Sequence, residues 1–234
     1  MRLHRFFVEE ELGGKKEFTT EDRELIHQWK DVFRLRAGEK VILLDNSGYE
    51  FYGTLELVSK DRAVVRIDEA RENETRKNSE KPEVHLYAAI IKKDNFEWIL
   101  EKGTELGVNR FVPIVASRSE KKNINVERAQ KIIKEASEQS GRTRLPTLGE
   151  VSSLENALLE KNVKCIAFHL SGEKFDSQKF SNEKMLGVLI GPEGGWTDEE
   201  ILMFKNKNIP VVSVGQTTLR AETAAIAISA LLLL

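Results

Sequence analysis

The chain has 234 residues, which is enough for one large domain or two small ones. Charged residues make up 32% and hydrophobic residues 40%, as is typical of a soluble globular protein, and the formal net charge of −2 excludes a global basic field for binding nucleic acids. Because Cys165 is the only cysteine, an intrachain disulfide is excluded and a reducing cytoplasm is the expected location.

The first 70 residues show the alternation of β-structure. Residues 41–44 and 49–58 predict two strands joined by a tight turn, residues 62–67 predict another strand, and residues 20–30 predict a short helix. Apolar side chains recur with a period of two in the second of these strands and are expected on one face: Tyr49, Phe51, Leu55 and Leu57. Several short strands of this kind predict a small β-barrel.

Residues 68–83 contain almost no large apolar side chain. Such a stretch cannot bury enough surface to offset the entropy lost on ordering it. We therefore expect a linker over residues 71–81, between an N-terminal domain (1–70) and a C-terminal domain (82–234).

After the linker the pattern changes to alternating strands and helices. Buried strands are expected over residues 84–91, 111–115, 163–169, 185–190 and 211–214. Asp94 with Glu97, and Thr197 with Glu200, have the spacing of helix capping boxes. This alternation predicts a mostly parallel sheet covered by helices. The apolar run over residues 224–234 is too short to span a bilayer and predicts a buried helix at an interface.

Two glycine loops follow predicted strands near the C-terminus. Gly191-Pro192-Glu193-Gly194-Gly195 opens a helix, and Gly215 precedes a second helix. Glycines allow a ligand to approach the backbone closely, and a helix start offers free N–H donors. Neither loop has the Walker A or GxGxxG pattern, so ATP and NAD are poor candidates. An ordinary strand-to-helix turn is the alternative for the first loop taken alone.

Arg220 and Glu222 lie beside the second loop. The guanidinium of Arg220 is suited to neutralising an anion, whereas an exposed surface arginine is the simpler alternative. Glu222 could brace Arg220 or the loop, or it could be an ordinary carboxylate at a helix start.

A basic stretch runs from Ser117 to Arg144, with eight basic and four acidic residues. A local excess of this kind can bind phosphates on a nearly neutral protein, although its arginines could equally be solvated charges. The histidines and the cysteine do not have metal-ligand spacing, so no metal site is expected.

Five separated motifs together resemble one family, the 16S ribosomal RNA uridine-N3 methyltransferases of the SPOUT class. The motifs are Val32–Glu39, Trp98–Val108, Arg118-Ser119, Glu138–Ser140 with Arg142 and Pro146, and the pair Gly191–Gly195 with Val214–Ala224. They span nearly the whole chain in the family's order. Thr218 and Trp196 depart from the family pattern, which more often has isoleucine and phenylalanine there.

The resemblance implies an α/β fold, in which a PUA-like β-barrel that binds RNA is followed by a SPOUT domain with a C-terminal trefoil knot. It implies S-adenosylmethionine as the cofactor, the 16S RNA of the small ribosomal subunit as the partner, and a homodimer. The implied cofactor-binding residues are Leu170, Ile190, Gly191, Pro192, Glu193, Gly194, Gly195, Val214, Gly215, Leu219 and Arg220. The implied catalytic residues are Arg220 and Glu222, and the implied RNA-binding residues are Arg5, Arg34, Arg118, Arg142 and Arg144.

The proton acceptor for uridine N3 stays open between Glu222, Glu193 and solvent. Two other functions also stay open at this point. A non-catalytic ribosome assembly factor would bind RNA without the cofactor, and a small-molecule enzyme would bind a nucleotide but not RNA.

Overall fold

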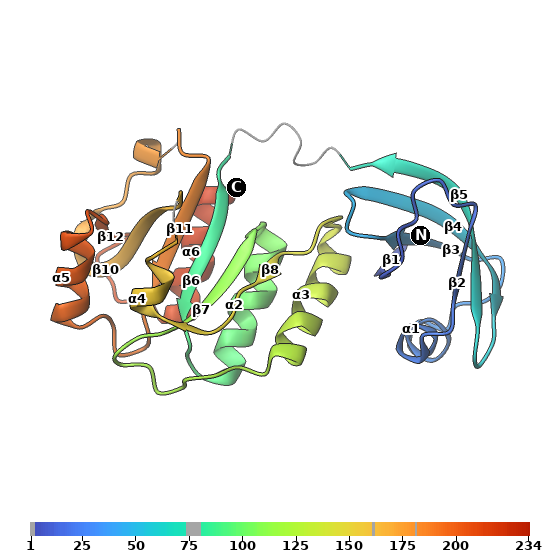
Figure 1. The fold of residues 1–234 in the computed structure, drawn as a ribbon, viewed down its shortest axis with the longest axis horizontal. Helices are drawn as coiled ribbons and strands as arrows, with labels where there is room; N and C mark the ends of the chain where they lie inside the picture. Colours follow the sequence, from blue (N-terminus) through green and yellow to red (C-terminus); the bar gives the residue numbers. More distant parts are fainter. Residues whose placement is uncertain (1–2, 74–80, 161, 181) are drawn as a thin grey trace. The chain divides into compact units, whose positions relative to one another are not determined.

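The computed structural model describes residues 3–73, 81–160, 162–180 and 182–234. The chain divides into two compact units, whose elements can be followed in Figure 1. The first unit comprises Met1–Asn78 and Ser137–Leu145, and the second comprises Ser79–Ala136 and Pro146–Leu234. The boundaries expected at residues 70 and 82 stay a prediction, because most of the proposed linker, residues 74–80, lies outside the described residues.

The first unit is built on a five-stranded sheet in the order β1-β3-β4-β5-β2. Its elements are β1 (His4–Phe7), β2 (Glu17–Thr20), α1 (Arg23–His27), the π-helical turn η1 (Gln28–Val32), β3 (Lys40–Leu44), β4 (Tyr49–Val58) and β5 (Ala63–Glu72). β1 pairs with β3 in parallel, and the other pairs are antiparallel. Asp22 caps α1, because its side chain accepts hydrogen bonds from the backbone N–H groups of Glu24 and Leu25.

Both faces of this sheet carry apolar residues. On one face Phe6, Val41 and Leu55 pack with Trp29 of η1 in the main core of the unit. On the other, Phe7, Ile42 and Leu44 form a smaller cluster against which Leu145 packs. The segment Ser137–Leu145 therefore belongs to the N-terminal unit, although it lies far along the chain. No sequence pattern indicated this.

The predicted alternation in β4 is only partly correct. Phe51 and Leu55 are buried, but Tyr49 and Leu57 are 39% and 44% exposed. The pairing of β4 with β5 shifts register between Leu55 and Leu57, and such an irregularity turns the following side chain away from the core. β5 also continues to Glu72, past the expected end at residue 67, because its last residues pair with the start of β4.

The second unit contains a parallel sheet with helices on both faces. Its elements are β6 (Glu83–Ala89), α2 (Lys93–Leu106), β7 (Arg110–Val115), α3 (Val126–Ser140, which ends in the first unit), β8 (Thr147–Leu148), β9 (Ser152–Ser153), α4 (Leu154–Ala157), β10 (Lys164–Lys174), the 3-10 turn η3 (Ser177–Phe180), β11 (Met185–Ile190), α5 (Asp198–Asn206), β12 (Val211–Ser213) and α6 (Ala221–Leu233). The strand order is β12-β10-β11-β6-β7-β8, with β9 also paired to β7, and every pair is parallel.

Strand β6 shows how the sheet separates two cores. Leu86 and Ala88 face the cluster that includes residues of α2, α3 and α6. Tyr87 and Ala89 face the cluster that includes residues of α4 and α5. A strand buried on both faces reads as a continuous apolar run, as residues 84–91 do.

Two details of the helices test the capping predictions. Thr197 and Glu200 form the predicted capping box at the start of α5. The prediction for Asp94 is wrong, because α2 begins at Lys93 and Asp94 lies within its first turn.

The last helix, α6, has the buried residues Ala225, Ile228 and Ser229, in agreement with the predicted buried helix. No helix in the described part of the chain is long and apolar enough to cross a membrane.

Candidate active site

The two glycine loops lie at the same edge of the parallel sheet. The first follows β11 and the second follows β12, and β10 lies between these two strands. Because all three strands run in the same direction, their carboxyl ends and the loops after them meet at one edge. This edge is where open α/β sheets bind ligands. Leu170, from β10, is 49% exposed.

Trp196 supports the first loop from within the protein. Its side chain is 3% exposed, packs edge-on against Phe204 at 5.1 Å between ring centroids, and donates from Nε1 to the carbonyl oxygen of Phe168 at 3.1 Å. A Cβ atom added to Gly191 would lie 3.1 Å from Cε2 of this indole ring. The packing of the loop onto Trp196 therefore favours glycine at 191, since a larger residue would press against the indole ring. Gly195 has φ of +68°, which favours glycine there for a conformational reason.

Polar contacts hold the exposed side of the same loop. The guanidinium of Arg118 donates to the carbonyl oxygens of Gly194, at 2.8 Å, and Trp196, at 3.3 Å. The carboxylate of Glu193 accepts from the backbone N–H of Lys92, which follows β6, at 3.2 Å. The loop is thus tied to the ends of two other strands.

Glu200 joins the start of α5 to the end of β7. It is 3% exposed, and its two oxygens accept from the backbone N–H groups of Thr197 at 2.8 Å and Ser117 at 2.9 Å. A buried carboxylate is tolerated when both oxygens have donors of this kind. The capping box therefore also anchors the segment that carries Arg118.

β10 has an irregularity beside the two loops. Phe168 and Glu173 both pair with Val212 of β12, so the four residues between them leave the regular ladder. A Cβ atom on Gly172 would lie 2.6 Å from the backbone of Val212, so only glycine fits this crossing. Leu170, within this excursion, is exposed at the same edge of the sheet as the two loops.

The second loop presents its backbone to solvent. Residues 216–219 are exposed, and within the described structure their backbone groups form no hydrogen bond. Gly215 has open space around the position of a Cβ atom, and its carbonyl oxygen accepts from Oγ of Ser213 at 2.7 Å. Free backbone donors and acceptors at a strand end can bind the polar edges of a ligand.

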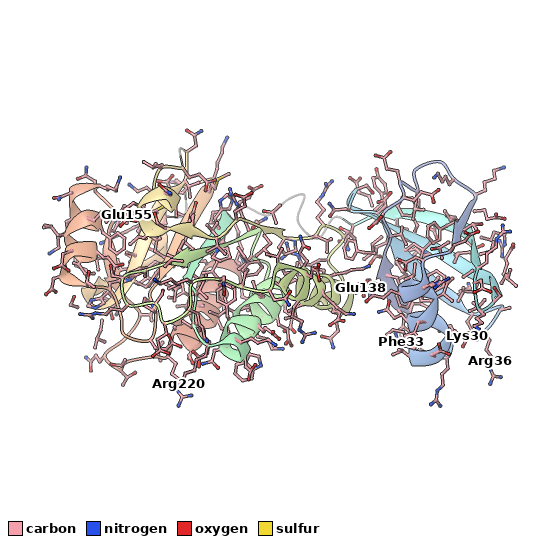
Figure 2. All side chains as sticks on the ribbon, turned by 60° about the horizontal axis from the view of Figure 1, so that its bottom comes forward. Lys30, Phe33, Arg36, Glu138, Glu155 and Arg220 are labelled. Carbon is pink, nitrogen blue, oxygen red and sulfur yellow. The ribbon has the colours of Figure 1, made fainter. Side chains whose placement is uncertain are left out.

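Arg220 and Glu222 lie at the start of α6 in different environments. Arg220 is the N-cap residue, and its side chain is exposed and extends away from the ribbon (Figure 2). Glu222 is 5% exposed, and its Oε2 atom has no hydrogen-bond partner among the described residues. No ion pair joins the two side chains, so the suggested bracing of Arg220 by Glu222 is not observed in this part of the structure. A buried carboxylate oxygen without a donor is costly, which is typical of functional sites.

The predicted RNA-binding arginines fall into two groups. Arg118 lies against the glycine loop of the second unit. Arg5, Arg34, Arg142 and Arg144 belong to the first unit. Nε of Arg5 pairs with the buried Glu50 at 2.8 Å, and Arg144 donates to backbone oxygens of the β3–β4 turn. These contacts give both side chains structural roles.

The comparisons with known proteins bear on the whole chain. The sequence model of an RNA methyltransferase domain matches residues 78–233, and that of an RNA methyltransferase PUA domain matches residues 30–68. The chain belongs to this RNA methyltransferase family. The family assignment made from the ordered motifs is confirmed.

Two proteins that are similar to this chain in sequence are called ribosomal RNA small subunit methyltransferase E. The protein from Bacillus subtilis is 31% identical over 242 residues, which cover 95% of this chain and 93% of the relative. The protein from Rickettsia conorii is 29% identical over 233 residues, which cover 97% of this chain and 93% of the relative.

Two solved structures are similar over nearly their full length. A ribosomal RNA small subunit methyltransferase E from Neisseria gonorrhoeae, bound to S-adenosyl methionine, has a TM-score of 0.86 at 25% identity and covers 98% of this chain and 96% of its own. A putative methyltransferase from Legionella pneumophila, in complex with the same cofactor, has a TM-score of 0.87 at 29% identity, with 99% and 97% covered. These neighbours confirm the predicted class, a PUA-like domain followed by a SPOUT α/β domain.

The residues that support the site are not among those that the sequence motifs indicate. Trp196 was noted only as a departure from the family, and Glu200 only as part of a capping box. Neither Lys92 nor Ser117 carries a sequence signal, because both act through backbone N–H groups. Only the fold brings these positions to the loop.

Proposed function

We propose that this RNA methyltransferase transfers the methyl group of S-adenosylmethionine to N3 of a uridine in the 16S RNA of the small ribosomal subunit. One observation carries the proposal: two glycine loops converge at one sheet edge with Arg220 and the buried Glu222, in a chain whose full-length relatives carry the name ribosomal RNA small subunit methyltransferase E.

The residues at this edge fit the cofactor. The unbonded backbone over residues 216–219 and the open space at Gly215 supply donors, acceptors and room for a nucleoside. The residues that would hold it are those inferred from the motifs, namely Leu170, Ile190, Gly191, Pro192, Glu193, Gly194, Gly195, Val214, Gly215, Leu219 and Arg220. When bound, the cofactor supplies an electrophilic methyl group. The protein has to orient the reactants and activate the nucleophile.

Arg220 is our candidate for stabilising the uracil ring as N3 loses its proton. The negative charge then spreads onto the two carbonyl oxygens that flank N3, and a guanidinium offers a fork of donors for them. The side chain of Arg220 is exposed and makes no hydrogen bond or ion pair with the described residues, so it is available to bind the uracil ring.

Glu222 is our candidate for the proton acceptor. It is a buried carboxylate with one unpartnered oxygen, close in sequence to Arg220. Glu193 is less suitable, because its side chain already accepts a hydrogen bond from Lys92. Proton transfer to a positioned carboxylate typically accelerates a reaction about 10²- to 10⁴-fold.

We also propose that the enzyme is a cytoplasmic homodimer. The C-terminal helix supports this proposal, because Leu231 and Leu234 are 58% and 81% exposed at its end. Large apolar side chains that are exposed at the end of a helix otherwise packed in the core favour a contact with another protein chain. Light scattering on the purified chain would test this part of the proposal separately from the chemistry.

The deciding experiment is methyl transfer from labelled S-adenosylmethionine to small ribosomal subunits that lack the modification, followed by mass spectrometry of the nucleosides. The proposal predicts a new 3-methyluridine. Cofactor binding without incorporation into subunits or free ribosomal RNA would show that the substrate is wrong. RNA binding without cofactor binding would instead support the non-catalytic assembly factor.

A further inference from the structure

An exposed aromatic ring in the first unit lies among cations that have no partner. Phe33 follows η1 and is 36% exposed, and its neighbour Val32 is 60% exposed. Lys30, Arg34 and Arg36 are exposed as well, and within the described part of the chain none of their side-chain nitrogens has a hydrogen bond or ion pair. Lys30, Phe33 and Arg36, which Figure 2 labels, come from η1 and the segment directly after it.

The ring of Phe33 is held in position by other aromatic rings. Its centroid lies 4.3 Å from that of His4, with the two planes tilted by 48°. It also makes an edge contact with Phe6 at 5.4 Å, and Phe6 packs against the buried Trp29 at 5.4 Å. Phe33 is therefore the exposed end of an aromatic stack that continues into the core. A ring fixed in this way loses little entropy when a ligand stacks on it.

Arg34 has an uncommon backbone conformation. Its φ is +56°, in the left-handed region that few residues other than glycine adopt. This conformation ends the helical turn η1, because it lets the backbone N–H of Leu35 donate to the carbonyl oxygen of Trp29 at 2.8 Å. The surface carries a small excess of positive charge, because Lys30, Arg34 and Arg36 outnumber the two nearby carboxylates. These are Asp31, which bonds to His27 at 2.7 Å, and Glu39, which accepts from the backbone N–H of Arg36 at 2.6 Å.

These observations describe a surface that combines an aromatic platform with an excess of positive charge. We propose that Phe33 and His4, with Lys30, Arg34 and Arg36 around them, form a docking surface for single-stranded RNA, on which one unpaired base stacks. The cations would contact the phosphates on either side of that base. The inference rests on the proposed function only for the identity of the polyanion as RNA.

This surface differs from the RNA-binding arginines inferred from the motifs. Arg5 and Arg144 are engaged with Glu50 and with backbone oxygens of the first unit, whereas Lys30 and Arg36 have side chains free to bind phosphate. Only Arg34 belongs to both sets. The aromatic component adds a preference that charge alone cannot supply, since stacking requires a base that is not paired in a duplex.

The test is the affinity of the full chain for a short fluorescein-labelled single-stranded oligouridylate, measured by fluorescence anisotropy. We expect Phe33→Leu, which keeps an apolar contact with Phe6 but removes the ring, to weaken binding about 5- to 150-fold. Phe33→Trp should bind as tightly as the wild type or more tightly. A duplex of the same length should bind more weakly than the single strand.

The cations are tested separately, through the salt dependence of binding. Lys30→Gln and Arg36→Gln should each weaken binding and reduce the slope of log K against log salt by about 0.7, the value for one phosphate contact on a single strand. Phe33→Leu should leave that slope unchanged. Arg34→Gly suits the left-handed backbone, so it should weaken binding without lowering the melting temperature. Arg71→Gln is the matched control, because it removes one positive charge, as Lys30→Gln and Arg36→Gln do. Arg71 is on β5, where it pairs with Glu69 and lies opposite Glu50 of β4, and it is not part of the proposed docking surface.

Wild-type affinity in Phe33→Leu, or equal binding of duplex and single strand, would overturn the proposal. Unchanged salt slopes in both Lys30→Gln and Arg36→Gln would overturn the role of the cations. The oligonucleotide assay needs neither cofactor nor catalysis. A failure of methyl transfer with these binding results intact would therefore refute the proposed function and not the docking surface.

Discussion

Arg118 donates a hydrogen bond from its guanidinium to the carbonyl oxygen of Gly194 at 2.8 Å. The same side chain also donates to the carbonyl oxygen of Trp196. One arginine that follows β7 is therefore hydrogen-bonded at two points to the glycine loop that follows β11. Preorganisation of a binding loop reduces the entropy that a ligand must overcome. Arg118 is therefore a positioning residue for the proposed cofactor site as well as a candidate RNA contact.

Loss of this contact should weaken cofactor binding. We expect Arg118→Ala to raise the Kd for S-adenosylmethionine about 3- to 10-fold, because an exposed charged hydrogen bond contributes about 1 kcal/mol. Isothermal titration calorimetry gives the Kd directly. Arg128→Ala is the control, since Arg128 is an exposed arginine paired with Glu97 on α2. Equal affinity in the wild type and Arg118→Ala would contradict the positioning role.

Replacement of Arg220 should affect the chemical step. Arg220→Ala removes the group proposed to stabilise charge on the uracil ring, and donors of this kind contribute about 3–4 kcal/mol, which corresponds to a roughly 10²- to 10³-fold fall in kcat. Arg220→Lys should restore only part of the lost kcat, because an ammonium group lacks the planar, two-pronged set of N–H donors of a guanidinium. Single-turnover methyl transfer at saturating cofactor and RNA is the measurement. Full activity in Arg220→Ala would remove Arg220 from the mechanism.

Glu222→Gln separates a catalytic role of this carboxylate from a structural one. The amide has nearly the same shape but cannot accept the proton, so a base predicts slower turnover with unchanged cofactor affinity. If Glu222 only fills space at the start of α6, the activity should persist and the melting temperature should equal or exceed that of the wild type. Both quantities can be measured on the same preparation.

Gly172 should tolerate no larger residue. A Cβ atom at this position would lie 2.6 Å from backbone atoms of Val212, so Gly172→Ala forces β10 and β12 apart. We expect a loss of about 1–3 kcal/mol in the free energy of unfolding, measured by urea denaturation. Gly215→Ala is the steric control, because nothing lies within 4 Å of the added atom. Equal stability of the two variants would show that β10 at Gly172 and β12 at Val212 are packed less tightly than the structure indicates.

The thiol of Cys165 should be unreactive in the folded protein. Burial, together with the nearby Glu160, raises its pKa to about 11, whereas an ordinary cysteine titrates near 8.5. The reactive thiolate is therefore scarce at neutral pH. Alkylation by iodoacetamide should accelerate only as the pH approaches 11, and in denaturant it should accelerate near the ordinary value. Rapid alkylation of the native protein at pH 8 would contradict this prediction.

His85 should make the protein less stable in acid. It is buried, Nδ1 lacks a hydrogen-bond partner in the described structure, and burial lowers its pKa below the usual 6.5. Below that pH the unfolded chain binds a proton that the folded chain does not, so stability falls as the pH falls. His85→Gln should lose less free energy of unfolding between pH 7 and pH 5 than the wild type. The exposed His27→Gln serves as the control.

Much of the local structure followed from the sequence. The strand over residues 185–190 was predicted with the observed bounds, and the capping box of Thr197 and Glu200 was also correct. Such features depend on neighbouring residues alone, through side-chain periodicity and hydrogen bonds that span a few positions. The errors have tertiary causes. Leu57 is exposed because a register shift in the pairing with β5 overrides the alternation of β4.

The sequence by itself determined the longer strands of the parallel sheet, the family and the two glycine loops, because these reside in composition, spacing and ordered motifs. It gave no sign of the short strands β1, β2, β8 and β9. Only the tertiary structure decided which groups meet. Parallel pairing of β10 with β11 and β12 brings the two loops to one edge, and the contacts of Arg118 and Lys92 with the first loop come from distant strand ends. Contacts made through backbone atoms leave no residue signature, since any amino acid except proline carries the same N–H group.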